Sequence, residues 1–211
     1  MRVTVVDYNS GNLQSVMQSL HAAAEKAGLD VSFKLSGDAE DIAAADRIVL
    51  PGVGSFADCA QNLRAIDGME DALNDAVFKR AVPFLGICVG MQLMAERGFE
   101  DGETQGLGWI SGHVEKIKAE GLKIPHMGWS GLDLKTDHAV FKDIEQGHAV
   151  YFVHSYHFNA VHEKDVLAEM HYGGRLIAAI GRDNMMGMQF HPEKSQNIGQ
   201  VMLTNWLNWT F

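Results

Sequence analysis

The sequence has only two cysteines, Cys59 and Cys88, among its 211 residues. Two thiols cannot form the disulfide framework of a small secreted protein, and a reducing compartment would leave both free. Only four prolines are present, and no repeat, low-complexity tract or linker is visible. Residues 1–211 are therefore predicted to form a single domain.

Basic residues are also scarce, since 17 Lys and Arg stand against 27 Asp and Glu, for a formal net charge of −10. An acidic chain without a run of Lys or Arg is a poor candidate for nonspecific nucleic-acid binding. No apolar run approaches the ~18 residues that a membrane span requires. The N-terminus lacks the shape of a signal peptide, so we expect a cytoplasmic protein.

The first half of the chain alternates strand patterns with helical patterns. Strands are predicted at 3–6, 31–35, 47–50, where Pro51-Gly52 should end the strand, and 82–87. Helices are predicted at 13–27, stopped by Gly28, at 56–78 with a break near Asp67-Gly68, and at 91–97, stopped by Gly98. Such alternation predicts an α/β fold, in which a mainly parallel sheet carries helices on both faces.

The second half has shorter strand patterns, at 112–118, 149–154, 166–172, 175–181 and 185–190. Gly173-Gly174 is typical of a hairpin turn. We expect these strands to extend the sheet as an antiparallel or mixed region, which makes it an open mixed sheet. A final amphipathic helix is predicted between Ile198 and Trp206.

Cys88 follows an apolar strand directly and begins a helix, in the segment Gly86-Ile87-Cys88-Val89-Gly90. Close approach of strand and helix at such a turn requires small neighbours, as in a nucleophile elbow with Cys in place of Ser. The helix N-terminus would favour thiolate, and the N–H of Val89 could bind an oxyanion. The alternative is a small buried hydrophobic residue, the role we assign to Cys59.

His191 follows the strand at 185–190 and precedes Pro192 and Glu193. In an extended segment, residues two apart point to the same side, so Glu193 can orient the His191 ring. Together with Cys88, these residues predict a Cys-His-Glu catalytic triad. A His-x-Glu pair is weak evidence alone, and becomes stronger when it is combined with the bracketed cysteine.

Glycines surround Val53 in the segment Leu50-Pro51-Gly52-Val53-Gly54, which lacks the GK[ST] ending of a phosphate loop. The segment could be an ordinary loop at the end of a strand. Alternatively, the backbone near Val53 could supply the second oxyanion donor.

The segments GICVGMQ, QFHPEKS and LPGVGSF resemble the class I, triad-type glutamine amidotransferases over essentially the whole chain. The resemblance implies a flavodoxin-like core and a glutaminase reaction with no cofactor. No metal site is expected, because the histidines lack ligand spacing such as H-E-x-x-H and the two cysteines are too far apart for a CxxC knuckle. It implies that Cys88 attacks the side-chain amide of glutamine and that Val89 and Val53 hold the oxyanion. Gly52, Gln92, Ser155 and Tyr156 are the implied substrate-binding residues. In this family the Val53 peptide can lie unproductively until the partner subunit is loaded.

Further segments, among them DYNSGNL, PHMGW and YFVHSY, resemble the glutaminase subunits of imidazole glycerol phosphate synthases in histidine biosynthesis. This narrower resemblance implies a heterodimer with a (β/α)8-barrel cyclase subunit, which uses the ammonia to make imidazole glycerol phosphate and AICAR. It implies Asn12, Trp129, Tyr151 and Lys194 as interface residues. Trp129 could instead be a core aromatic residue, and Lys194 a solvated charge.

Three positions depart from the family pattern, namely Asn9, Val89 and Ser130. Asn9 stands where glycine is usual, and Asn can adopt the same left-handed turn. Ser130 stands where Asn is usual, and we expect it to lose a polar contact near the interface. Val89 replaces a more usual Leu, which matters little because the backbone amide is used.

Two alternatives remain open. A related glutaminase could supply ammonia for the amidation of cell-surface sugars, and the sequence does not exclude this. A catalytically silent scaffold on the same fold is the second alternative, and the intact Cys88, His191 and Glu193 argue against it. The glutaminase subunit of anthranilate synthase fits less well, because its segments differ from those around His126–Trp129 and Lys194-Ser195.

Overall fold

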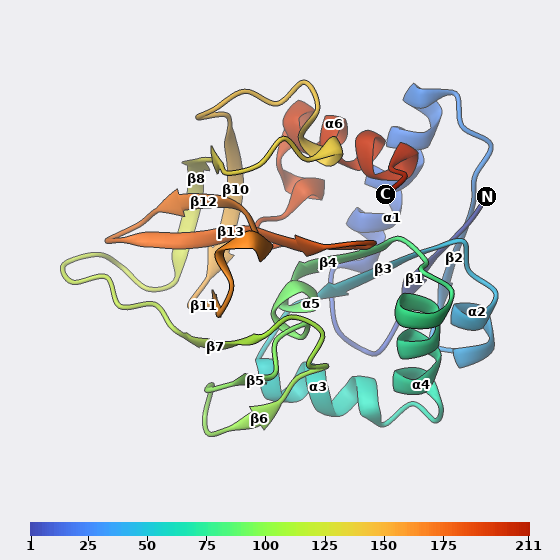
Figure 1. Ribbon diagram of the computed structural model, residues 1–211, viewed down its shortest axis with the longest axis horizontal. Helices are drawn as coiled ribbons and strands as arrows, with labels where there is room; N and C mark the ends of the chain where they lie inside the picture. Colours follow the sequence, from blue (N-terminus) through green and yellow to red (C-terminus); the bar gives the residue numbers. More distant parts are fainter.

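The structure is a computed structural model that describes all 211 residues, Met1–Phe211. An eight-stranded sheet with the order β2-β1-β3-β4-β14-β13-β12-β9 forms its centre (Figure 1). Five strands run parallel: β2 (Ser32–Ser36), β1 (Arg2–Val6), β3 (Arg47–Gly52), β4 (Phe84–Cys88) and β14 (Met185–Met188). Antiparallel pairing adds the last three: β13 (Arg175–Arg182), β12 (Val166–His171) and β9 (Asp133–Leu134). The predicted open mixed sheet is confirmed.

Helices cover both faces of this sheet, as predicted (Figure 1). The helices α1 (Leu13–Ala27) and α6 (Gln196–Asn208) pack together on one face. The other face carries α2 (Ala39–Ala43), α3 (Phe56–Arg64), α4 (Met69–Asn74) and the π-helical turn Asp75–Lys79. One-turn 3-10 helices occur at Ala139–Phe141, Glu163–Asp165 and Pro192–Lys194.

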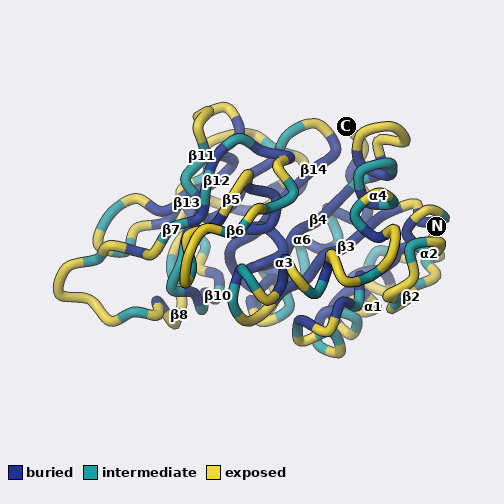
Figure 2. The backbone as a smooth tube through the Cα atoms, turned by 90° about the horizontal axis from the view of Figure 1, so that it is seen from below, coloured by how far each residue is buried: buried dark blue, intermediate teal, exposed yellow.

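The central strands β3, β4 and β14 are buried throughout, whereas the edge strand β2 is partly exposed (Figure 2). In β1, Val3, Val5 and Val6 are fully buried, which matches the β-branched run in the sequence. Gly28 ends α1 in the left-handed conformation, with φ of 64°, as predicted. Gly68 begins α4 in the same conformation and produces the predicted break.

The predicted helix at 91–97 is wrong. The helix α5 spans only Val89–Gln92, and Arg97–Gly98 forms a short strand, β5. The carbonyl of Leu93 accepts a hydrogen bond from the N–H of Leu107. The carbonyls of residues 94–96 likewise accept hydrogen bonds from N–H groups of residues 106–110. Because these carbonyls are already paired, they cannot accept the bonds that would continue a helix.

The expectation that all later strands extend the central sheet is only partly correct. A separate four-stranded sheet contains β11 (Tyr156–Ala160), β7 (Gly112–Lys116), β5 and β6 (Thr104–Gln105). The strands β8 (His126–Gly131) and β10 (Ala149–His154) form a separate antiparallel pair. These strands pair through distant partners, which local periodicity does not reveal.

Pro51 does not end β3, contrary to expectation. The strand continues to Gly52, and Pro51 and Gly52 pair with Ile87 and Cys88 of β4. Pairing of β3 with β1 has already stopped at Val49. Pro51 therefore lies beside one strand rather than between two, where its missing N–H is tolerated. None of the helices has both the length and the hydrophobicity needed to cross a lipid bilayer.

Candidate active site

Cys88 lies on the sharp turn that the glycine bracketing predicted. It ends β4 and precedes α5, with φ of 55° and ψ of −112°, a conformation that is strained for a side-chain-bearing residue. A Cβ at Gly90 would overlap the carbonyl oxygen of Leu50, and one at Gly86 would lie 2.7 Å from the Gly90 oxygen. Both glycines are therefore required by the approach of strand and turn.

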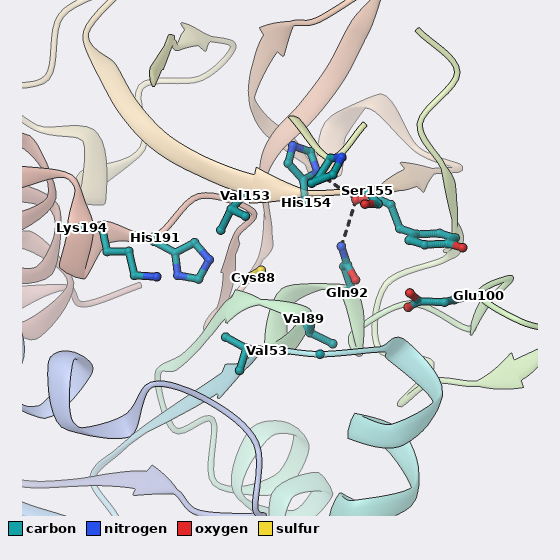
Figure 3. Close-up of a pocket in the computed structure, with 13 residues that line it drawn as sticks. Val53, Cys88, Val89, Gln92, Glu100, Val153, His154, Ser155, His191 and Lys194 are labelled. Atoms are coloured by element: carbon teal, nitrogen blue, oxygen red, sulfur yellow. Dashed lines mark hydrogen bonds between the residues drawn. The ribbon is translucent and has the colours of Figure 1, made fainter. Parts of the chain in front are cut away.

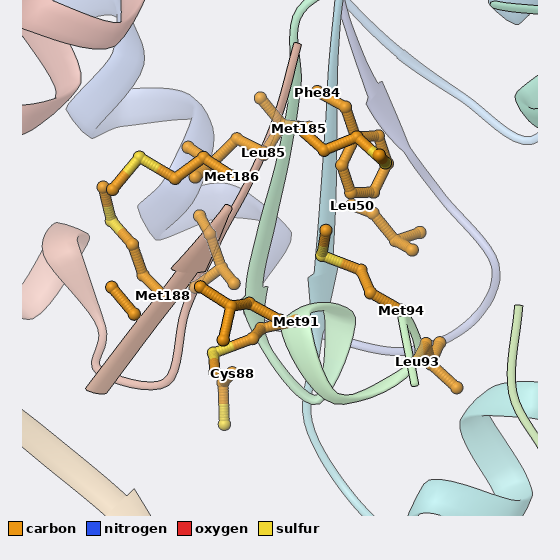
Figure 4. Close-up of a cluster of buried hydrophobic side chains, with 14 of the residues drawn as sticks. Leu50, Phe84, Leu85, Cys88, Met91, Leu93, Met94, Met185, Met186 and Met188 are labelled. Atoms are coloured by element: carbon orange, nitrogen blue, oxygen red, sulfur yellow. The ribbon is translucent and has the colours of Figure 1, made fainter. Parts of the chain in front are cut away.

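Packing beneath the turn holds Cys88 in this conformation. The buried side chains of Met91 and Met188 lie next to the turn (Figure 4). Cys88 itself is only 5% exposed. Because α5 is a single turn, the helix dipole invoked from the sequence is smaller than a full helix would provide. The N–H of Val89, in the first turn, still has no partner within the helix.

A cavity of about 260 Å³ opens beside Cys88. Eight of the residues that line it were predicted from the sequence: Val53, Cys88, Val89, Gln92, Ser155, Tyr156, His191 and Lys194 (Figure 3). They come from the loop after β3, the Cys88 turn and α5, the β10–β11 connection with the first residue of β11, and the segment after β14. The fold thus brings together residues that are widely separated in the sequence. No group of three or more His, Cys, Asp or Glu side chains is arranged to hold a metal ion.

His191 and Glu193 form the predicted pair. The Nδ1 of His191 lies 2.7 Å from Oε1 of Glu193, and both side chains are 2% exposed. A carboxylate only accepts, so His191 carries a proton on Nδ1. Its Nε2 is buried and has no hydrogen-bond partner within the protein. That nitrogen is therefore available to a group in the cavity, on the side where Cys88 lies (Figure 3).

The surroundings of His191 stabilise its charged form. Burial by itself lowers the pKa, but the neighbouring Cys88 and Glu193 outweigh burial and raise the pKa of His191 to about 9. Nε2 of His191 forms no hydrogen bond to Cys88 in this geometry, although both residues line the same cavity. The site can therefore hold an imidazolium beside a sulfur nucleophile.

Two buried glutamines form a polar contact behind Cys88. The Nε2 of Gln92 donates to Oε1 of Gln189 at 3.0 Å and to the backbone oxygen of Tyr156 at 3.1 Å. The Nε2 of Gln189 in turn lies 3.8 Å from Sγ of Cys88. Gln92 was predicted, whereas Gln189 was missed, although it stands two residues before His191. Its position in an otherwise apolar buried strand could have marked it.

The backbone N–H of Val53, the predicted second oxyanion donor, is directed at Ser10. It donates to Oγ of Ser10 at 3.3 Å, and Oγ of Ser10 donates to the Val53 oxygen at 2.8 Å. Both polar groups of Val53 are therefore held by one side chain. The Val53 N–H is therefore committed to Ser10 in this structure, and its role as an oxyanion donor stays a prediction.

Gly52 does not line the cavity, although it was predicted to bind substrate. It packs against the Cys88 turn, where an added Cβ would lie 2.8 Å from the Gly90 nitrogen and 2.7 Å from the Tyr8 hydroxyl. Gly54 lines the cavity instead. Gly52 therefore allows the β3 loop to approach the turn, rather than forming part of the pocket wall.

Sequence reasoning missed Glu100 and His154, which also line the cavity (Figure 3). Oε2 of Glu100 accepts from the N–H of Phe56 at 2.7 Å, which holds a carboxylate at the far end of the cavity from His191. His154 lies in the predicted strand 149–154, but no local pattern distinguishes it from the other histidines. Both residues reach the site through tertiary packing alone.

Two interface candidates are neighbours. Trp129 of β8 and Tyr151 of β10 are directly paired, with ring centroids 5.9 Å apart. Trp129 is 48% exposed, which argues against the core alternative. The Tyr151 backbone oxygen accepts from the N–H of His191 at 2.9 Å, which links this pair to the catalytic segment. Asn12, directly before α1, and Lys194, at the cavity, are both exposed.

Three further predictions can be compared with the geometry. Asn9 adopts φ of 60°, the left-handed turn expected in place of glycine. Oγ of Ser130 lies 3.1 Å from Nε2 of His126, and the expected loss of a contact near the interface stays a prediction. Cys59 is buried as expected, with Sγ 3.0 Å from Oγ of Ser10, and burial is the main cause that raises its pKa.

Comparison with known proteins places these features in context. Residues 5–208 match the family model described as glutamine amidotransferase class-I. The chain is 52% identical to the imidazole glycerol phosphate synthase subunit HisH of Brucella suis, with 99% of each chain covered. It is also 52% identical to the subunit of that name in Rhodospirillum rubrum, again with 99% of each covered.

Solved structures share the fold at low identity. One, described as a glutamine amidotransferase, has a TM-score of 0.69 at 19% identity and covers 95% of this chain and 98% of its own. Another, a glutamine amidotransferase from Thermotoga maritima, has a TM-score of 0.60 at 17% identity. It covers 92% of this chain and 76% of its own. These similarities establish the architecture alone.

Proposed function

The chain belongs to the class-I glutamine amidotransferase family, and we propose that it is the glutamine-hydrolysing subunit of an imidazole glycerol phosphate synthase in histidine biosynthesis. The observation that carries the proposal is Cys88 on a strained turn, at one cavity with the buried His191–Glu193 pair. An amide hydrolysed there yields glutamate and ammonia. The identity to subunits named HisH supports the pathway.

The first chemical step is attack on the amide. Sγ of Cys88 bonds to the side-chain carbonyl carbon of glutamine, and the carbonyl oxygen becomes an oxyanion. The N–H of Val89 donates to that oxyanion, and the N–H of Val53 joins it after leaving Ser10. His191 transfers the proton on Nε2 to the departing nitrogen, which leaves as ammonia and produces a thioester.

The second step restores the enzyme. Nε2 of His191, now unprotonated, takes a proton from water as the water oxygen attacks the thioester carbon. The carbon–sulfur bond breaks, glutamate leaves, and the thiolate–imidazolium pair returns. Glu193 keeps the proton on Nδ1 throughout, which holds the ring in one orientation and stabilises its charge.

Glu100 gives the cavity a polarity suited to an amino acid. Its carboxylate lies at the end of the cavity away from His191 and can accept a hydrogen bond from the α-ammonium group of glutamine. The amide would then point toward Cys88. Gln92, Ser155 and Tyr156 border the same cavity, where the Gln92 amide and the backbone around Ser155 can offer polar groups to the substrate.

We propose a (β/α)8-barrel cyclase as the partner, docked over the face that carries Trp129 and Tyr151. Trp129 is 48% exposed and its strand neighbour Met127 63% exposed, and such apolar exposure is typical of an interaction surface. Lys194, beside the cavity, and Asn12 are the polar candidates at this interface. Ammonia would then enter the barrel directly instead of bulk water, where it would be protonated.

The test measures glutamate release by the chain alone, and with the cyclase and its own substrate. We expect turnover to rise when the partner and substrate are added. Cys88→Ala should lower glutamine-dependent turnover by more than about 10³-fold. Synthesis driven by added ammonium should persist in that variant, which shows that the complex is intact.

Two results would contradict the proposal. If Cys88→Ala retained glutaminase activity, the assignment of Cys88 to the catalytic triad would be wrong. Failure to restore growth of a histidine auxotroph that lacks this subunit would instead point to the alternative pathway of surface-sugar amidation.

A further inference from the structure

A row of hydrogen-bonded polar groups lies behind the cavity, on the side opposite His191. His126 lies at the start of β8, and His154 at the end of β10. Oγ of Ser130 lies 3.1 Å from Nε2 of His126, and Nδ1 of His126 lies 3.2 Å from Nε2 of His154. Nδ1 of His154 lies 2.9 Å from the backbone oxygen of Tyr156. The row joins an exposed strand to the cavity wall.

The tautomer of each ring follows from its partners. A backbone oxygen only accepts, so Nδ1 of His154 must donate to Tyr156. Burial lowers the pKa of His154 to about 4, so the ring is neutral near pH 7 and Nε2 is an acceptor. Nδ1 of His126 must therefore donate to it. Burial also lowers the pKa of His126, so its Nε2 accepts from the Ser130 hydroxyl.

The row continues on the cavity side through Gln92. The Tyr156 oxygen accepts from both His154 and Nε2 of Gln92, so both of its lone pairs are used. The second hydrogen on Nε2 of Gln92 is donated to Gln189. With its nitrogen fully committed, Gln92 presents its amide oxygen on the side that faces Glu100 (Figure 3). The direction of the row therefore determines which end of the amide a ligand meets.

We propose that His154 and His126 are positioning residues, which hold the Tyr156 carbonyl and thereby orient Gln92 to receive glutamine. The inference rests on the proposed glutaminase function. Neither ring touches the reacting atoms in this role. Substrate binding should depend on the row more than the chemical step does, because Cys88, His191 and Glu193 are held by separate contacts.

Ser130 is the end of the row that lies on the exposed face of β8. It lies next to Trp129 in β8 and pairs with Val150 of β10. Removing its hydroxyl leaves the two histidine donors in place, so its effect should be the smallest of the three. The expected order of effects is therefore His154, then His126, then Ser130.

The kinetic experiment uses the complex with the cyclase, and compares two changes at His154. His154→Phe keeps the ring volume but removes the donor to Tyr156, and the KM for glutamine should rise about tenfold, with kcat changed less than threefold. His154→Asn loses volume but keeps an N–H at the position of Nδ1. It should restore most of the affinity, which a packing role would not produce.

One control variant and one further test variant complete the kinetic experiment. His157→Phe changes another buried histidine, one residue beyond Tyr156, whose side chain makes no hydrogen bond to the cavity residues. Its KM should stay within twofold of the wild type, and Ser130→Ala should raise KM about twofold to threefold. An unchanged KM in His154→Phe, or an equal rise in His157→Phe, overturns the proposal.

A second measurement does not depend on activity. Nitrogen-15 NMR of the histidine-labelled full-length chain at pH 7 should show both rings as the Nδ1–H tautomer. The two signals are identified by their loss in His126→Phe and His154→Phe. An Nε2–H tautomer or a doubly protonated ring at either position would contradict the proposed row of hydrogen bonds. If the wild-type complex did not hydrolyse glutamine, the proposed function would fail, and these spectra would still decide whether the row exists.

Discussion

The two walls of the cavity each contain a buried histidine, and the two histidines have opposite properties. His191 faces a carboxylate and a sulfur, and its pKa is raised to about 9. His154 faces a backbone carbonyl and another neutral ring, and burial lowers its pKa to about 4. Burial opposes the charged form in both cases. The difference shows that the available partners, not burial, decide whether a histidine here carries charge.

This contrast divides the site into a reactive wall and a holding wall. The reactive wall stands at the ends of β4 and β14, where parallel strands of the main sheet finish. The holding wall belongs to β8, β10 and the start of β11, outside that sheet. Cys88 and His191 therefore lie at the edge of the main sheet, whereas the groups proposed to hold substrate lie in a smaller layer that also bears the exposed Trp129.

The largest expected effect comes from making the reactive wall resemble the holding wall. Glu193→Gln replaces the carboxylate with a neutral acceptor, so the pKa of His191 should fall and the imidazolium should be lost. We expect kcat/KM for glutamine in the complex to drop by about 10²- to 10⁴-fold. The pH–rate profile should shift with it. A drop of less than tenfold would contradict the assigned role of Glu193.

The two histidines should also have opposite effects on the pH dependence of stability. Because the folded pKa of His154 lies near 4, below its ordinary 6.5, its contribution is lost as the pH falls from 6.5 to 4. Because the folded pKa of His191 lies near 9, its contribution is complete below pH 6.5 and is lost as the pH rises through 9. Each window should change the free energy of unfolding on the order of 3 kcal/mol.

Urea unfolding across the pH range measures both slopes. The variant His154→Asn should flatten the acid limb relative to the wild type, and His191→Asn should flatten the alkaline limb. Each comparison uses the change in slope, so a uniform loss of stability does not affect it. Parallel curves for variant and wild type would show that the histidine in question does not change its pKa on folding.

A smaller effect is expected from removing the contacts between Ser10 and the Val53 peptide. Ser10→Ala removes both contacts to the Val53 peptide, so the N–H of Val53 can turn toward the cavity more often. Glutaminase activity without the partner should rise up to about tenfold, the population shift that one such hydrogen bond allows. Ser55→Ala, in the same loop but bonded to Asp58, is the matched control and should leave this activity unchanged. An unchanged activity in Ser10→Ala would exclude Ser10 as the restraint.

The smallest effect should come from the side chain of Tyr156. The holding wall uses its backbone oxygen, and no hydrogen bond involves its hydroxyl in this structure. Tyr156→Phe should therefore change the KM for glutamine by less than about twofold, well within the range of surface substitutions. A tenfold rise would mean that the phenol itself contacts the substrate.

Short-range sequence patterns were sufficient to predict the reactive wall. Gly86 is demanded by the nearby backbone of Gly90, whereas Gly90 is demanded by the Leu50 carbonyl on the neighbouring strand. The two-residue spacing of His191 and Glu193 follows from extended geometry. Much of the parallel core was also predictable, because β1, β3 and β4 carry runs of buried, mainly apolar residues. The helix expected over 91–97 failed because distant N–H groups occupy its carbonyls.

The sequence by itself determined the turn at Cys88, the His191–Glu193 pair and the parallel sheet that presents them, since local patterns of residue type and spacing indicate each. Only the tertiary structure decided that Glu100, Gln189, His154 and His126 belong to the site, and that β8 and β10 leave the main sheet. Their roles arise from contacts between segments far apart in the chain. Because a hydrogen bond requires a partner at a particular distance and direction, the local residue pattern does not specify it.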